Sequence, residues 1–77
     1  MSEATRLATD AGSKDPGTGL RAVAALRRLL ERLEALQVGN ARVQGWSWQQ
    51  IAEHLGVTKQ SVHKKYTRRR LAGRGDR

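Results

Sequence analysis

The chain has 77 residues, with 15 Lys and Arg, 7 Asp and Glu, and no cysteine. This length allows one small domain of marginal stability, and the lack of cysteine excludes disulfides, thiolate metal sites and thiol catalysis. The formal charge of +8 makes nucleic acid the first partner to consider and an anionic membrane the second.

Residues 1–19 are expected to form a flexible tail. They contain the only proline and, after Met1, only Leu7 as a large aliphatic residue, so the segment has little apolar surface to offset the entropy of ordering. They also lack the apolar centre of a signal peptide, and no apolar run in the chain approaches the roughly 18 residues of a membrane span. We therefore expect a cytoplasmic protein.

Residues 20–44 are predicted to form one long helix. Thr18 is a candidate N-cap, Gly39 weakens the helix, and Gly45 provides a stop. The apolar residues recur at helical spacing and form a broad stripe: Val23, Leu26, Leu29, Leu30, Leu33 and Leu36.

Part of this stripe has the spacing of a coiled coil. Successive gaps of 3, 4, 3, 4 and 3 residues separate Leu26, Leu29, Leu33, Leu36, Asn40 and Val43. That is the a/d pattern of a short coiled coil with a polar Asn at one a position. We predict a homodimer through Leu26, Leu29, Leu33, Leu36 and Asn40. The alternative is that the stripe packs onto the later helices of the same chain.

Residues 45–70 contain signals for two short helices and a tight turn. Ser47 and Gln50 have the spacing of a capping box, and Trp46 with Ile51 has that of a hydrophobic staple. Gly56 can take the left-handed conformation at the end of the first helix, and Thr58 is a candidate cap for the second. One buried face is predicted for the first helix: Trp48, Ile51, Ala52 and Leu55. Ala52 is small enough to let the two helices approach.

The second short helix separates an inward side from an outward one. Val62 points toward the core, and Tyr66 one turn later shares its face. The outward side carries Gln60, Lys64 and Thr67. Gln can pair with adenine, whereas Lys can reach guanine or a phosphate.

The segment I-A-x-x-L-G-V-T-x-x-S-V, from Ile51 to Val62, resembles the helix-turn-helix of bacterial sigma-factor region 4, resolvase and invertase C-terminal domains and many small regulators. The resemblance covers about 21 of the 77 residues, from Trp46 to Tyr66, and implies an all-α domain of three helices, the third of which lies in the major groove. It implies these base contacts: Lys59, Gln60, Ser61 and Lys64. It also implies these contacts to the DNA backbone: Trp46, Ser47, Gln49, His63, Lys65, Thr67 and Arg68. We predict a backbone contact from Thr58 as well. An aliphatic residue is common in these families where this chain has Lys65, so Tyr66 must close the core instead.

The overall layout also resembles small actinomycete proteins with a single DNA-binding motif, among them GATC-binding nucleoid-associated proteins. It consists of a leucine-rich helix, then G-W-S-W-Q-Q-I-A, then V-H-K-K-Y and a basic end. This resemblance implies an abundant dimer that touches many short sites in the nucleoid and bends DNA.

The positive charge is concentrated at the C-terminal end. Residues 46–77 hold eight Lys or Arg and only two acidic residues, and residues 71–77 are expected to form a basic flexible tail. We predict phosphate contacts from the neighbouring Arg69 and Arg70 as well; the alternative is a tail that only aids solubility. Neither a metal site nor a cofactor site is expected, because His54 and His63 have no partner ligand at suitable spacing.

The sequence thus predicts an all-α fold: a disordered N-terminal tail, a long first helix and a helix-turn-helix. The predicted function is binding of double-stranded DNA by a homodimer, either as a nucleoid-associated factor or as a transcription regulator. No catalytic residue pattern is visible, so no enzyme activity is expected. Two alternatives are an adaptor that binds proteins through the leucine-rich helix and an accessory factor of a mobile element.

Overall fold

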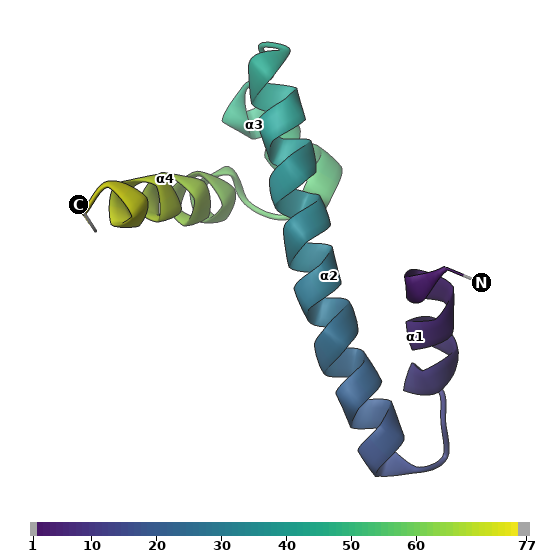
Figure 1. Cartoon of the computed structure of the whole chain (residues 1–77). Coiled ribbons are helices and arrows are strands. Elements are labelled where there is room, and N and C mark those ends of the chain that lie inside the picture. Colours follow the sequence, from purple (N-terminus) through teal and green to yellow (C-terminus); the bar gives the residue numbers. More distant parts are fainter. Residues whose placement is uncertain (1, 76–77) are drawn as a thin grey trace. The chain divides into compact units, whose positions relative to one another are not determined.

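The described part of the chain folds into four helices and contains two compact units. The computed structural model describes the backbone of residues 2–75 and the side chains of residues 2–67. Its helices are α1 (Glu3–Ala11), α2 (Pro16–Val43), α3 (Trp48–Leu55) and α4 (Lys59–Gly75), and this part of the chain has no strand (Figure 1). The two compact units are Met1–Gln37 and Val38–Arg77, with the boundary inside α2. The all-α prediction is confirmed, and the helix-turn-helix occupies the second unit.

Helix α1 lies within residues 1–19, the segment for which the sequence predicts a flexible tail. Ser2 caps it, because the Ser2 hydroxyl accepts a hydrogen bond from the Thr5 backbone N–H at 3.1 Å. Leu7, Asp10 and Ala11 are half-buried at helical spacing, and α1 folds back alongside the first part of α2 (Figure 1). The Ser2 cap and the half-burial of one side of α1 are the features that favour this helix in a segment with little apolar surface.

Helix α2 begins earlier than predicted because Asp15, rather than Thr18, provides its cap. The Asp15 carboxylate accepts hydrogen bonds from the Thr18 backbone N–H at 3.0 Å and from the Thr18 hydroxyl at 2.8 Å. These two bonds hold the pKa of Asp15 below its ordinary value. Pro16 then takes the first helical position, where its missing N–H costs nothing.

Small residues of α2 meet α1 within the first unit. Ala22 is buried, with 4% of its surface exposed, and Gly19 is buried as well. A Cβ atom added at Gly19 would lie 3.6 Å from the carbonyl oxygens of Ala11 and Ser13. The end of α1 therefore lies directly against this part of α2.

Helix α2 runs through Gly39 without interruption and ends at Val43, one residue before the predicted end. Gly45 has φ +90°, and its N–H donates to the Arg42 carbonyl at 3.0 Å. The Trp46 N–H donates to the Ala41 carbonyl at 2.9 Å. These two bonds form a Schellman motif, which confirms Gly45 as the stop.

The core of the second unit joins the end of α2 to α3 and α4. It is formed by Val38, Ile51, Ala52 and Val62, with four partly buried residues packed against it: Ala41, Trp46, Trp48 and Tyr66. The sequence pattern does not assign Val38 to the core. The predicted coiled-coil positions on α2 take no part in this cluster, so the end of α2 packs onto α3 and α4 through a different face.

Helix α4 extends to Gly75 and so enters the segment from residue 71 onward that the sequence predicts to be a basic flexible tail. Residues 71–75 continue the helical backbone of α4. Two residues of the predicted tail, 76 and 77, lie outside the described part of the chain.

Candidate nucleic-acid interface

The start of α3 is fixed by the capping box that the sequence predicts. The Ser47 hydroxyl accepts a hydrogen bond from the Gln50 backbone N–H at 3.1 Å, and the Gln50 side-chain oxygen accepts one from the Ser47 N–H at 2.8 Å. Trp46 packs against the core that contains Ile51, as expected for a hydrophobic staple. Its ring centroid lies 4.7 Å from that of His54. Helix α3 therefore has a defined entry point.

The turn between α3 and α4 follows the predicted pattern in its backbone. Gly56 has φ +74° in the left-handed region, and the Thr58 hydroxyl accepts a hydrogen bond from the Ser61 N–H at 3.1 Å. Ala52 is 1% exposed, in agreement with its role where α3 and α4 approach. Leu55 was predicted to share the buried face, but it is 39% exposed. It lies in the last turn of α3, beyond the residues that the core covers.

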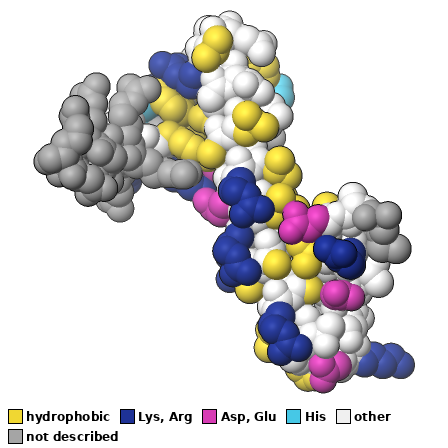
Figure 2. All heavy atoms as spheres, viewed as in Figure 1, with side chains coloured by type: hydrophobic (Ala, Val, Ile, Leu, Met, Phe, Trp, Pro, Cys, Tyr) yellow, Lys and Arg dark blue, Asp and Glu magenta, His cyan; other side chains and the backbone are white. Residues whose placement is uncertain are grey.

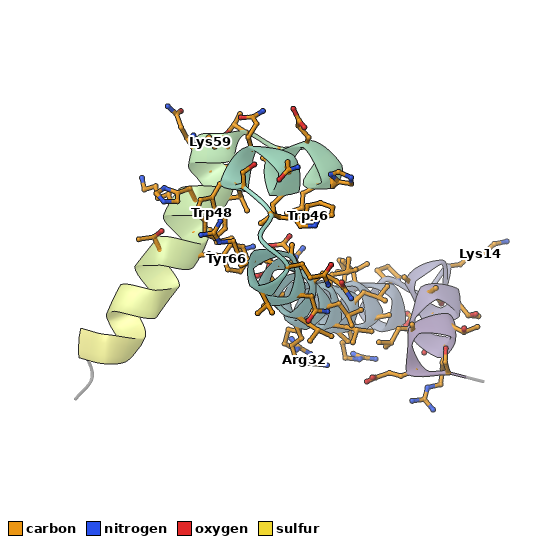
Figure 3. The ribbon with its side chains drawn as sticks, turned by 90° about the horizontal axis from the view of Figure 1, so that it is seen from above. Lys14, Arg32, Trp46, Trp48, Lys59 and Tyr66 are labelled. Carbon is orange, nitrogen blue, oxygen red and sulfur yellow. The ribbon has the colours of Figure 1, made fainter. Side chains whose placement is uncertain are left out.

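The outward side of α4 presents the four side chains predicted to contact bases. All four are exposed: Lys59, Gln60, Ser61 and Lys64. Val62 is only 3% exposed. Because successive residues turn by about 100° around a helix, Gln60 and Lys64 lie on the side opposite Val62. Figure 3 shows the Lys59 side chain pointing away from the start of α4.

Ser61 already has one hydrogen bond within the chain. Its hydroxyl donates to the Thr58 carbonyl at 2.9 Å, so its oxygen keeps acceptor capacity but its proton is engaged. Ser61 is therefore better suited to accept from a base amine than to donate to a phosphate.

The residues predicted to contact the DNA backbone are not equally placed. Ser47, Gln49, Thr58 and His63 are exposed, whereas Trp46, Lys65 and Thr67 are half-buried. Gln49 donates from its amide to the Glu53 carboxylate at 3.2 Å, and the Lys65 ammonium lies 5.6 Å from the Tyr66 ring centroid. The half-burial of Thr67 differs from its predicted outward position. The side chains of Arg68, Arg69 and Arg70 lie outside the described residues.

The charge on α4 has one sign. Residues 59–75 contain Lys and Arg but neither Asp nor Glu, and Lys59 and Lys64 are exposed. A helix of this composition produces a positive field over its outward side, which favours a polyanion.

Arg42 is a residue of this region that the sequence had not singled out. Its guanidinium lies 4.6 Å from the centroid of the Trp48 ring, and its Nη1 donates to the Trp46 carbonyl at 2.8 Å. Trp48 in turn meets two rings of α4, those of His63 and Tyr66. Figure 3 shows Trp48 and Tyr66 pointing toward one another. An arginine in the last turn of a helix, just before an aromatic turn, is the sequence signal that could have revealed Arg42.

Nowhere from residue 2 to residue 75 is a helix both long enough and apolar enough to cross a membrane. The same residues bring together no group of three or more side chains from His, Cys, Asp and Glu that could hold a metal ion.

Comparison with protein families matches residues 20–74, more than half of the chain, to a homeodomain-like domain. This span covers most of α2 together with α3 and α4. Comparison with curated proteins gives no match, and neither does comparison with solved structures.

Proposed function

This chain belongs to the homeodomain-like domain family of helix-turn-helix DNA-binding proteins, and we propose that it binds double-stranded DNA with α4 in the major groove. The observation that carries this proposal is that α4 has one buried side and one exposed side. Val62 is buried against α3, while Gln60 and Lys64 are exposed on the opposite side. The major groove of B-DNA is wide enough to admit one helix presented in this way.

The proposed base contacts use the side chains at the start of α4. Gln60 can form a bidentate pair with adenine, and Lys64 can reach guanine or a phosphate. Lys59 and Ser61 lie beside them. The exposed Ser47, Gln49, Thr58 and His63 are suited to hydrogen bonds with phosphate oxygens, which orient the protein without reading sequence.

We propose further that the protein acts as a homodimer through α2. Leu33 and Leu36 are 46% and 56% exposed in the single chain, and Asn40 is exposed as well. Figure 2 shows apolar side chains at the surface along α2, next to Lys and Arg. Exposed leucines at a/d spacing support pairing with a second helix of the same kind, and Asn40 would restrict its register.

The biological role that we propose is either nucleoid-associated or regulatory. The recognition surface on α4 is small, which favours a short half-site and therefore many sites in a bacterial genome. Mapping of genome-wide occupancy separates the two roles. Thousands of sites indicate chromosome organisation, including the GATC-binding type, whereas a few indicate a transcription regulator.

The salt dependence of binding tests the DNA proposal. If roughly six phosphates are neutralised, the slope of log K against log salt is about −5. Fluorescence anisotropy of a labelled duplex over a range of salt concentrations measures this slope. Affinity that does not change with salt contradicts the proposal. Absence of duplex binding at physiological salt favours instead an adaptor that uses the exposed leucines of α2.

A further inference from the structure

Arg42 connects the α2–α3 turn to the ring of Trp48. Its Nη1 donates to the Trp46 carbonyl at 2.8 Å, and its guanidinium carbon lies 4.6 Å from the centroid of the Trp48 ring. A planar guanidinium is well suited to both contacts, because it stacks on an indole face while its N–H groups bond in the plane. One side chain thereby restrains both the path of the turn and the position of the indole.

Trp48 carries this restraint to α4. Its ring centroid lies 5.4 Å from that of His63, edge to face, and 6.4 Å from that of Tyr66 with an angle of 19° between the planes. His63 and Tyr66 are three residues apart and therefore lie on neighbouring positions of one helix side. An indole against both rings opposes rotation of α4 about its own axis.

The rotation of α4 decides where its outward side chains point. Val62 anchors α4 in the core, and the Trp48–Tyr66 contact holds it a second time, about one turn later. Two anchors along the axis fix the rotation better than one. Gln60 and Lys64 are carried by the same helix, so a change in rotation moves both together.

We propose that Arg42 is a positioning residue for α4, which acts through Trp48 and does not contact DNA itself. This inference rests on the proposed DNA binding. It predicts that Arg42 matters for affinity through its planar shape and its two contacts. A positive charge at position 42 is not sufficient to position α4, so lysine cannot replace Arg42.

The test compares Arg42→Ala and Arg42→Lys with the wild-type chain, using a fluorescein-labelled duplex selected from a random pool by the wild type. We expect about fivefold weaker binding for Arg42→Ala, because only part of the free energy of the cation–ring contact and the charged hydrogen bond acts on the position of α4. The affinity of Arg42→Lys should be close to that of Arg42→Ala. The slope of log K against log salt should be the same in both variants as in the wild type. Arg6→Ala removes one exposed arginine of α1 and is the matched control, expected to bind like the wild type.

Three results would overturn the role of Arg42. If the slope of log K against log salt is reduced by about one, Arg42 contacts a phosphate. If Arg42→Lys binds with wild-type affinity, the positive charge is sufficient. If Arg42→Ala binds with wild-type affinity, Arg42 has no role in binding. Circular dichroism checks that each variant is folded; if Arg42→Ala is not, Arg42→Lys alone decides between shape and charge. A wild-type chain that binds no duplex instead contradicts the proposed function.

Discussion

Gln60 and Lys64 are the side chains on which sequence reading by this protein should depend. Both are exposed on α4, four residues apart and on the side away from Val62. Side chains at i and i+4 lie one above the other on a helix, so the two can reach neighbouring base pairs.

Substitution of either residue by alanine should relax sequence choice. A good side-chain pair contributes roughly 1–3 kcal/mol of discrimination against a wrong base, so Gln60→Ala should bind preferred and altered duplexes more equally. Lys64→Ala should do the same at a neighbouring base pair, with some general loss of affinity. Competition between the preferred duplex and duplexes with single changed base pairs measures both effects.

Lys14→Ala provides the control for Lys64→Ala. Lys14 is an exposed lysine in the turn between α1 and α2, so its removal changes the net charge equally without touching α4. If Lys64→Ala and Lys14→Ala leave the order of preferred duplexes equally unchanged, then Lys64 does not read bases.

Residue positions that depend on short-range hydrogen bonds could be predicted from the sequence. The caps at Ser47 and Thr58 join groups three residues apart, so the local sequence determines them. Val38 and Arg42 could not be assigned in this way. Their contacts depend on the angle at which α2 enters the core, and that angle is set by residues far along the chain.

At the scale of elements, α1 changes what the α2 stripe can bind. The a/d spacing of Leu26 and Leu29 extends backward to Ala22 and Gly19, and these two small residues are buried where α1 folds back. The chain thus covers the beginning of its own coiled-coil face, while Leu33 and the positions after it stay exposed.

Single cysteines on α2 should distinguish the covered part from the exposed part. The chain has no native cysteine, so Ala22→Cys and Leu36→Cys each introduce a unique thiol. Cys at position 22 should react slowly with an alkylating reagent at every protein concentration, because α1 of the same chain covers it. Cys at position 36 should become protected only as the concentration rises and a second copy covers it.

The rates of alkylation can also refute this division of the stripe. If protection at position 22 rises with protein concentration, then a second chain covers that position. If position 36 reacts at the same fast rate at all concentrations, then α2 does not pair there.

The sequence predicts α3 and α4 well but misses α1, for a physical reason. Both ends of α3 carry strong local signals, at Ser47 and Gly56. Helix α1 has a serine cap but only one large aliphatic residue, and a helix this short is marginal without a packing surface. The closeness of its end to Gly19 of α2 is a tertiary feature that the local sequence does not reveal.

At the scale of the whole molecule, few of the side chains that the structure describes are buried. Among the described residues, the buried apolar ones are Ala22, Val38, Ile51, Ala52 and Val62. A chain with so little enclosed apolar surface has low intrinsic stability. Association with a second chain that covers the exposed leucines would increase this stability.

The Tm of the protein should therefore rise with protein concentration. A partner that binds only the folded chain stabilises it by mass action, and a hundredfold increase in concentration should raise the Tm by roughly several degrees. Thermal melts followed by circular dichroism at two concentrations measure the shift. Leu33→Glu with Leu36→Glu should abolish the concentration dependence. An equal Tm for the wild type at both concentrations argues against the homodimer.

The two tryptophans of the chain, Trp46 and Trp48, both lie beside the core of the second unit. The first unit has none. Intrinsic emission excited at the indole band therefore reports on the helix-turn-helix alone, whereas far-ultraviolet ellipticity sums over every helix. If heat or denaturant unfolds α1 and the first part of α2 first, the ellipticity falls before the tryptophan emission changes. An unlabelled sample therefore reveals whether the two units unfold together.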